Sequence, residues 1–346
     1  MSFKAPPLAA GIFYYGLLAA SFIPPQGQRD LRDLTRYRTK LVQERSRAVN
    51  RVQGVLERAN IKLASVATDI MGVSGRAILA ALIQGRADPA TMAELAKGRM
   101  RAKLPLLEQA LTGLMRDHHR RLLALQLAHI DFLDEQIETL SVEITRSLGE
   151  LEAEVPPSPT LPGTTGEVTG TTDGDAPRPP MPFMQAIAVL DTIPGVDQRG
   201  AELLVAEWGT DMRRFGTASR LSAWTGVAPG NDESAGKRRS GKTRQGNHTL
   251  RTGLTQIAHA AARTKGTYLS ALYQRLAARR GKKRAIMAVA HAIVVSAFHM
   301  LSRQEPYREL GPNYFDERRR DHLVDRLTRR IQHLGYRVHL EPVQTA

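Results

Sequence analysis

The stretch LALQLAHIDFLDEQIETLSVEITRSLGEL, residues 123–151, decides the fold. Leucine or isoleucine recurs in it at alternating steps of three and four residues. This spacing places apolar side chains along one stripe of a helix and is typical of a coiled coil. The stripe consists of Leu123, Leu127, Ile130, Leu133, Ile137, Leu140, Ile144, Leu148 and Leu151. Such a stripe needs an apolar partner, either elsewhere in the same chain or in a second copy.

Residues 30–61 offer the partner within the chain. Leucine and valine recur there at mixed three- and four-residue steps, with Arg, Lys and Glu between them. The pattern predicts a second helix that folds back on the first. An antiparallel hairpin and a dimer both satisfy it, so the sequence leaves the two alternatives open.

A segment rich in Pro, Gly and Thr divides the chain at residues 153–182, and its composition predicts a linker. Everything after it looks helical, and no convincing run of alternating strands appears anywhere. We therefore predict a mainly α fold: a long helical coiled-coil region over residues 27–152, a helical domain over 183–310 and a basic helical tail over 311–346.

The charge of the chain points to a polyanionic partner. Among its 346 residues, 49 Lys and Arg outnumber 34 Asp and Glu, which gives a net charge of +15. Nucleic acid is the commonest partner of such a protein, and a merely soluble basic protein is the alternative. No cysteine is present, which excludes disulfides, zinc sites with thiolate ligands and cysteine nucleophiles.

The uncharged run at residues 8–23 lies between two Pro-Pro pairs. The run is too short for a membrane-spanning helix, which needs about 20 apolar residues. A signal peptide would have a more basic start, whereas Lys4 is the only cation before this run. We expect a buried helix or the scar of a larger domain, and no membrane. A membrane-tethered basic protein is the weaker alternative.

Residues 190–209, LDTIPGVDQRGAELLVAEWG, have the pattern of a helix-hairpin-helix. In that motif a glycine permits the tight turn, and the free N–H groups of the second helix bind a phosphate. Gly195 and Val196 are the expected contacts. Asp197 replaces the usual second glycine and brings a negative charge close to the phosphate position.

Residues 231–251, NDESAGKRRSGKTRQGNHTLR, crowd cations, glycines and hydroxyls together. Residues 236–243 satisfy the phosphate-loop pattern G-x-x-x-x-G-K-[ST] to the letter. That loop needs a buried strand before it and a helix after it. Neither flank fits here, so we do not expect an ATPase.

These motifs together resemble the insertion-sequence transposases of the family called "one-ten", which are RNA-guided recombinases with a catalytic serine. The resemblance spans about residues 23–315. It is carried by residues 33–37, 193–196, 224–230, 234–237, 246–247 with 250–251, and 285–301. It implies DNA strand exchange in transposition, with DNA and a guide (bridge) RNA as partners.

The resemblance assigns the nucleophile to Ser234, in the S-x-G-K position. Without it, Ser222, Ser240, Thr243 and Thr249 would be equal candidates. A hydroxyl attacks a phosphodiester only if its proton is removed and the phosphate charge is neutralised. We expect that charge to be met by Lys237, Arg238, Arg239, Lys242 and Arg244, while Asn247 and Arg251 pin the loop or a phosphate.

A complete family member begins with a ribonuclease-H-like domain in which four acidic residues bind divalent metal. The positions that match the last two acids are Ser2 and Ala5, which cannot bind Mg²⁺. We expect residues 1–26 to be a remnant of that domain. Mg²⁺ belongs to the complete family site, and no cofactor is expected in this chain.

The sequence therefore predicts a truncated, bacterial, cytoplasmic and nucleoid-associated transposase. It would form a homo-oligomer or pair with a full-length relative. The alternative is a catalytically inactive remnant that binds nucleic acid and oligomerises.

Overall fold

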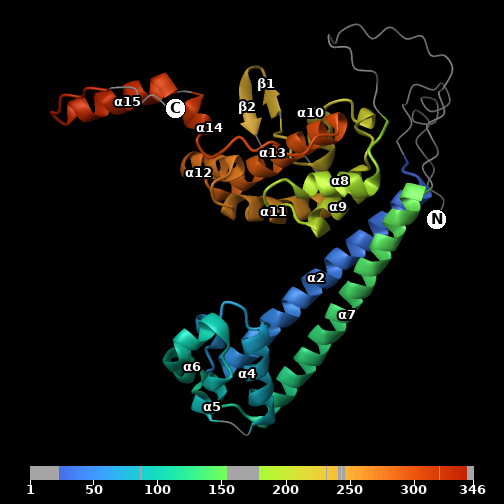
Figure 1. Cartoon of the computed structure of the whole chain (residues 1–346), viewed down its shortest axis with the longest axis vertical. Coiled ribbons are helices and arrows are strands. Elements are labelled where there is room, and N and C mark those ends of the chain that lie inside the picture. The colour runs from blue at the N-terminus through green and yellow to red at the C-terminus, as the bar shows by residue number, and fades with distance from the viewer. Residues whose placement is uncertain are drawn as a thin grey trace.

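The computed structural model describes residues 23–85, 88–153, 179–230, 232–240, 243, 246–318 and 320–340. For residues 153, 232–234, 237–240 and 323 it describes the backbone alone. Figure 1 shows a long pair of helices with a cluster of short helices at one end and a larger group of helices at the other. The described residues are mostly helical, so the predicted mainly α fold is confirmed.

The long pair is formed by α2 (Gln26–Arg58) and α7 (Asp117–Ala153), which run antiparallel along each other. The stripe of α7 faces α2. Leu133 and Ile137 pack against Leu41 at the middle of the pair, and Ile130 is fully buried. The helix of the same chain therefore covers the stripe. Of the two open alternatives, the intramolecular hairpin is the observed one, and coiled-coil packing in detail stays a prediction.

Short helices close the far end of the long pair. They are α3 (Leu63–Val66), α4 (Val73–Gln84), α5 (Pro89–Glu94), the 3-10 helix η1 (Gly98–Lys103) and α6 (Leu104–Leu111). Ile78 and Leu79 of α4, Leu107 of α6 and Val52 of α2 share one apolar core that the sequence pattern did not delimit. This core fixes the turn between the two long helices.

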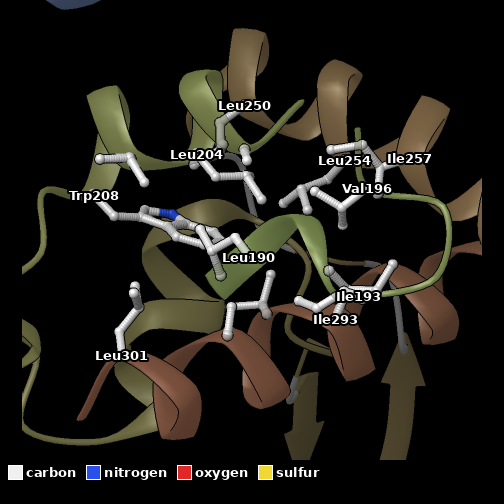
Figure 2. Packing of buried hydrophobic residues seen from close by; sticks show 14 of the residues in the cluster. Leu190, Ile193, Val196, Leu204, Trp208, Leu250, Leu254, Ile257, Ile293 and Leu301 are labelled. Carbon is white, nitrogen blue, oxygen red and sulfur yellow. The ribbon is translucent and has the colours of Figure 1, made fainter. Parts of the chain in front are cut away.

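The larger group surrounds the apolar helix α13 (Lys282–Arg303). Its other members are α8 (Phe183–Asp191), α9 (Gln198–Trp208), η2 (Met212–Arg214), α10 (Ala218–Thr225), α11 (His248–Arg263) and α12 (Tyr268–Arg280). Figure 2 shows side chains of these helices, among them Leu190, Trp208, Leu254 and Ile293, pointing toward one another.

By length and composition alone α13 could cross a membrane. It is the central helix of this core, however, and Val289, Ile293 and Ala297 are fully buried. A central helix of a compact core satisfies the same criteria, so this finding carries little weight for a membrane.

The long pair and the larger group share one core. Leu31 of α2 and Ile144 and Leu148 of α7 belong to the same apolar cluster as Leu190 and Leu204. The N-terminal half of α2 and the C-terminal half of α7 therefore belong to the same helical group that carries the basic loop, residues 231–247.

The prediction that the second half is helical throughout is wrong at one place. Residues of the basic loop form an antiparallel hairpin of β1 (Asp232–Ser234) and β2 (Lys237–Ser240). These strands are short and polar and lack alternating apolar residues, which explains why the sequence pattern did not reveal them. Beyond α13, the chain continues into α14 (Tyr314–Glu317) and α15 (Arg320–His333), and α15 points away from the rest (Figure 1).

Candidate functional site

The two-stranded hairpin presents Ser234 at its tip. The register pairs Ser234 with Lys237, Glu233 with Arg238 and Asp232 with Ser240, with an irregularity between the last two pairs. Ser234 is therefore the last strand residue before the turn, directly opposite Lys237. The backbone alone places the two residues of the S-x-G-K motif that would supply a nucleophile and a cation beside each other.

The turn between them is strained. Ala235 has φ of 51° and Gly236 has φ of 73°, so both lie in the left-handed region that a two-residue hairpin turn of type I′ requires. Glycine adopts this region freely, whereas alanine pays about 1–2 kcal/mol. Strain of this kind often marks functional sites, and here it falls on the residue after Ser234.

Two glycines hold the base of the hairpin together. A Cβ built on Gly246 would lie 2.6 Å from the Cα of Gly226, so a side chain at 246 has no room. Gly226 ends α10 in the left-handed conformation. The next two residues, Val227 and Ala228, donate their backbone N–H groups to the carbonyl of Ser222, each at 3.1 Å. The segment entering the hairpin is thereby tied to α10, and the segment leaving it passes directly alongside.

Asn247 holds the segment that leaves the hairpin. Its Oδ1 accepts a hydrogen bond from the N–H of Leu250 (3.1 Å) and so caps α11. Its Nδ2 donates to Oε2 of Glu207 (2.7 Å). Asn247 thus makes two hydrogen bonds within the protein, and its predicted role in pinning the loop or a phosphate stays a prediction.

Glu207 is a fully buried carboxylate that joins three helices. Arg36 of α2 donates Nε and Nη2 to its two oxygens (2.6 and 2.9 Å). Such a bidentate pair is the strong form of a charged hydrogen bond, and the bond to Glu207 raises the pKa of Arg36. Because Asn247 binds the same carboxylate, α2 is connected through one side chain to the residue that ends the basic loop.

Further polar contacts hold α2 on α9. Arg38 and Glu202 form a second ion pair at 2.5 Å, and both side chains are about 95 % buried, with exposed fractions of 5 % and 4 %. Arg32 donates to the carbonyls of Ala206 (2.9 Å) and Glu207. Burial lowers the pKa of Arg32. Sequence reasoning missed this network, although two carboxylates in the otherwise apolar helix α9 were a visible signal for buried partners.

The chain turns between α8 and α9 at Gly195, where φ is 88°, while the helix-hairpin-helix motif itself stays a prediction. A Cβ at this position would lie 2.2 Å from the backbone N of Ala261, so close packing against α11 also demands glycine. Asp197 caps α9 by accepting a hydrogen bond from the N–H of Gly200 (2.8 Å). A carboxylate therefore already occupies the N-terminus of α9 where the motif would hold a phosphate, and phosphate binding there stays a prediction.

A groove of about 870 Å³ runs between α2, this turn and α11. Gly195 and Val196, the predicted contacts, line it together with Arg47, Arg199 and Thr252. Arg47 and Arg199 are exposed. The two predicted residues thus lie beside cations that the sequence analysis did not single out.

The remaining predicted residues divide by position. Lys237, Arg238 and Arg239 lie in β2, where only the backbone is described. Lys242 and Arg244 fall outside the described residues, while Arg251 is partly buried in the first turn of α11. Residues 237–240 form a strand rather than part of a loop between a strand and a helix. The phosphate-loop pattern at 236–243 therefore lacks the architecture it needs.

Among the rival hydroxyls, Ser222 is fully buried and donates to the carbonyl of Ala218 (2.8 Å). A hydroxyl in that setting cannot reach a DNA strand. Ser240 lies at the base end of β2, opposite Asp232. Its position offers a matched control for Ser234 within the same hairpin.

In the part of the chain that the structure describes, no three His, Asp or Glu side chains gather closely enough to hold a metal ion. The Mg²⁺ that the resemblance implies has no fitting ligand set there. Ser2 and Ala5, like the rest of residues 1–22, fall outside the described residues.

Two comparisons with known proteins find sequence similarity to transposases. Residues 187–274 match the model of the Transposase IS116/IS110/IS902 family. A curated relative from Sinorhizobium fredii (strain NBRC 101917 / NGR234), named "Putative transposase y4pF/y4sB", is 31% identical over 125 residues. That alignment covers 35% of this chain and 32% of the relative, so the match spans about a third of the relative's length. The similarity to this family therefore lies in residues 187–274, from α8 to α12.

Proposed function

We propose that this chain, whose residues 187–274 match the IS116/IS110/IS902 transposase family, binds DNA and exchanges DNA strands during transposition of an insertion sequence. Ser234 is the nucleophile in this proposal. The observation that carries it is the backbone register: Ser234 is paired with Lys237 at the tip of a hairpin whose base is closed by Gly226 and Gly246.

The proposed reaction conserves phosphodiester bonds. Oγ of Ser234 attacks the phosphorus of a DNA phosphodiester, an Oγ–P bond forms, and the P–O bond to one deoxyribose breaks. The proton that leaves the serine is balanced by the proton that the departing sugar oxygen takes up. A sugar hydroxyl from another strand end then attacks the same phosphorus, and the serine leaves with a proton. The count of P–O bonds is unchanged, so no external energy source is needed.

The cations of the hairpin have a defined part in this reaction. The attacked phosphate gains negative charge in the transition state, and cations fixed nearby stabilise that charge. Lys237, Arg238 and Arg239 occupy consecutive positions of β2, beginning directly opposite Ser234. The base closed by Gly226 and Gly246 restricts the positions that the hairpin can take, which reduces the entropy lost on reaching the reactive geometry.

The partners of the proposed function are DNA, a guide RNA and further copies of the chain. A net charge of +15 supports the nucleic acids. The exposed apolar side chains of Val324, Leu327 and Ile331 on α15 support an oligomer or pairing with a full-length relative. The family's reaction takes place on the genome, so we propose a cytoplasmic, nucleoid-associated location.

A second function, binding of nucleic acid without strand exchange, is favoured by one observation. The described residues contain no carboxylate cluster able to hold the metal of a complete family site. The experiment must therefore separate binding from chemistry.

The test is detection of a covalent protein–DNA adduct on a denaturing gel, with labelled DNA of the element's ends and its transcript. The variants are wild type, Ser234→Ala and the hairpin control Ser240→Ala. We expect an adduct with wild type and Ser240→Ala, and none with Ser234→Ala, although all three bind DNA. An adduct that survives Ser234→Ala would contradict the proposal. Binding by wild type without any adduct would establish the second function.

A further inference from the structure

A basic and aromatic patch lies beside the base of the hairpin. It is formed by η2 and α10 and contains Arg213, Phe215, Arg220 and Trp224. None of these residues belongs to the predicted site. The patch reaches the hairpin through Gly226, which follows Trp224 by two residues and contacts Gly246.

Trp224 presents a fixed aromatic surface to solvent. The residue is 41% exposed. The ring of Phe215 meets it edge-on, with centroids 5.7 Å apart and planes at 60°. An edge-on contact supports the indole ring while leaving surface for a further ring to stack.

Two arginines lie close to this ring along the chain: Arg220 precedes Trp224 by four residues in α10, on the same helix face, and Arg213 precedes Phe215 by two residues. Arg213 is exposed and pairs with Asp211 (2.7 Å), which has its pKa lowered despite its partial burial because Arg213 binds it. Arg220 is exposed, and its Nη1 lies 3.3 Å from a Cβ position built on Gly216, next to Phe215. A guanidinium therefore lies on each side of Phe215 along the chain.

We infer that this patch binds an unpaired segment of nucleic acid: one base stacks on Trp224, and the neighbouring phosphates bind Arg213 and Arg220. Stacking on an aromatic side chain flanked by cations is how single strands are held without sequence readout. The base pairs of a duplex leave no free base face, so the patch discriminates between single and double strands. The inference rests on the proposed nucleic-acid function and adds the strand state that it recognises.

The chain contains two tryptophans, which makes the test direct. Trp208 is 1% exposed, so quenching of the emission by a ligand reports Trp224. Wild type is titrated with an unstructured oligothymidylate, with an oligouridylate and with a duplex, at fixed salt. We expect quenching by one or both single strands. The DNA and RNA arms distinguish an unpaired DNA strand from an unpaired part of the guide RNA as the source.

The variants separate stacking from structure. Trp224→Ala is expected to weaken single-strand binding about tenfold or more while changing duplex affinity less than twofold, measured by anisotropy. Trp224→Phe should restore most of the loss, which a structural role would not predict. Arg220→Gln should reduce the salt slope of single-strand binding by about one. Single-strand affinity unchanged in Trp224→Ala, or an equal loss for duplex, would overturn the inference alone. Failure of wild type to bind any nucleic acid would overturn the proposed function as well.

Discussion

The two halves of α2 are held in opposite ways. Its C-terminal half packs Val52, Val55 and Leu56 into an apolar core with the short helices. Its N-terminal half adds Leu31 to another apolar core and is also held on α9 by ion pairs to two buried carboxylates, Arg36 with Glu207 and Arg38 with Glu202. Apolar packing accepts residues of similar shape, whereas a buried charge demands its one partner. The polar half therefore fixes the position of α2 relative to Asn247, the residue that ends the basic loop, and the apolar half supplies stability.

The largest effect is expected at the more buried ion pair. Glu202→Leu leaves the guanidinium of Arg38 buried without its partner and should lower the free energy of unfolding by about 3–5 kcal/mol. The double variant Arg38→Met with Glu202→Leu should recover most of this loss, because both charges are gone. Urea unfolding measures both. A double variant as unstable as the single one would show that the pair is not what holds this half of α2.

A smaller loss is expected at the apolar half. Ile130 is fully buried in the core that α7 shares with α2. Ile130→Ala should cost about 2–4 kcal/mol, and Ile130→Val about 1 kcal/mol, because the cost follows the volume removed. The same denaturation experiment tests this. If Ile130→Val were as costly as Ile130→Ala, packing at this half would be as specific as the ion pairs.

Because Asn247 donates to Glu207, the conservative substitution Asn247→Asp should destabilise the protein. Asn and Asp are equally good caps, yet Asn247→Asp places a second carboxylate against Glu207, where Nδ2 now donates at 2.7 Å. We expect a loss of about 2 kcal/mol at neutral pH, against about 1 kcal/mol for Asn247→Ala.

The pH dependence of this variant has a definite sign. Two adjacent carboxylates repel each other when both are charged, and protonation of either one relieves that repulsion in the folded state. Stability of Asn247→Asp relative to wild type should therefore improve as pH falls and worsen as pH rises. Thermal unfolding at several pH values measures it, with Asn247→Ala as the uncharged control. A pH-independent difference would exclude contact between the two carboxylates.

The smallest effect is expected at the tip of the hairpin. Ala235→Gly removes the cost of φ at 51° and should stabilise the turn locally by about 1 kcal/mol. Hydrogen exchange of the amides of residues 232–240 should slow, with no change in the overall midpoint of unfolding. Faster exchange in Ala235→Gly would show that the alanine side chain stabilises the turn despite its positive φ.

The contrast between periodic apolar packing and individual polar contacts also explains which features the sequence could predict. The stripe from Leu123 to Leu151 is periodic, so its helix and its need for a partner were readable. The choice between hairpin and dimer was not, because both cover the stripe equally well. Glu207 and Arg36 are separated by 171 residues, and nothing in the pattern pairs them. The Ser234 hairpin has no apolar alternation, and its assignment as a site came from resemblance to a family rather than from periodicity.

Glu207 positions the hairpin through Asn247, and hydrogen exchange tests this coupling most directly. The amides to follow are Leu250, which donates to the Asn247 cap, and those of residues 232–240, in wild type, Glu207→Leu and the control Ile130→Val. The α4 amides near Leu79, in the distant core, verify that each variant is folded. We predict faster exchange at Leu250 and the hairpin in Glu207→Leu alone. If a folded Glu207→Leu variant protected these amides as well as wild type does, Glu207 would not position the hairpin.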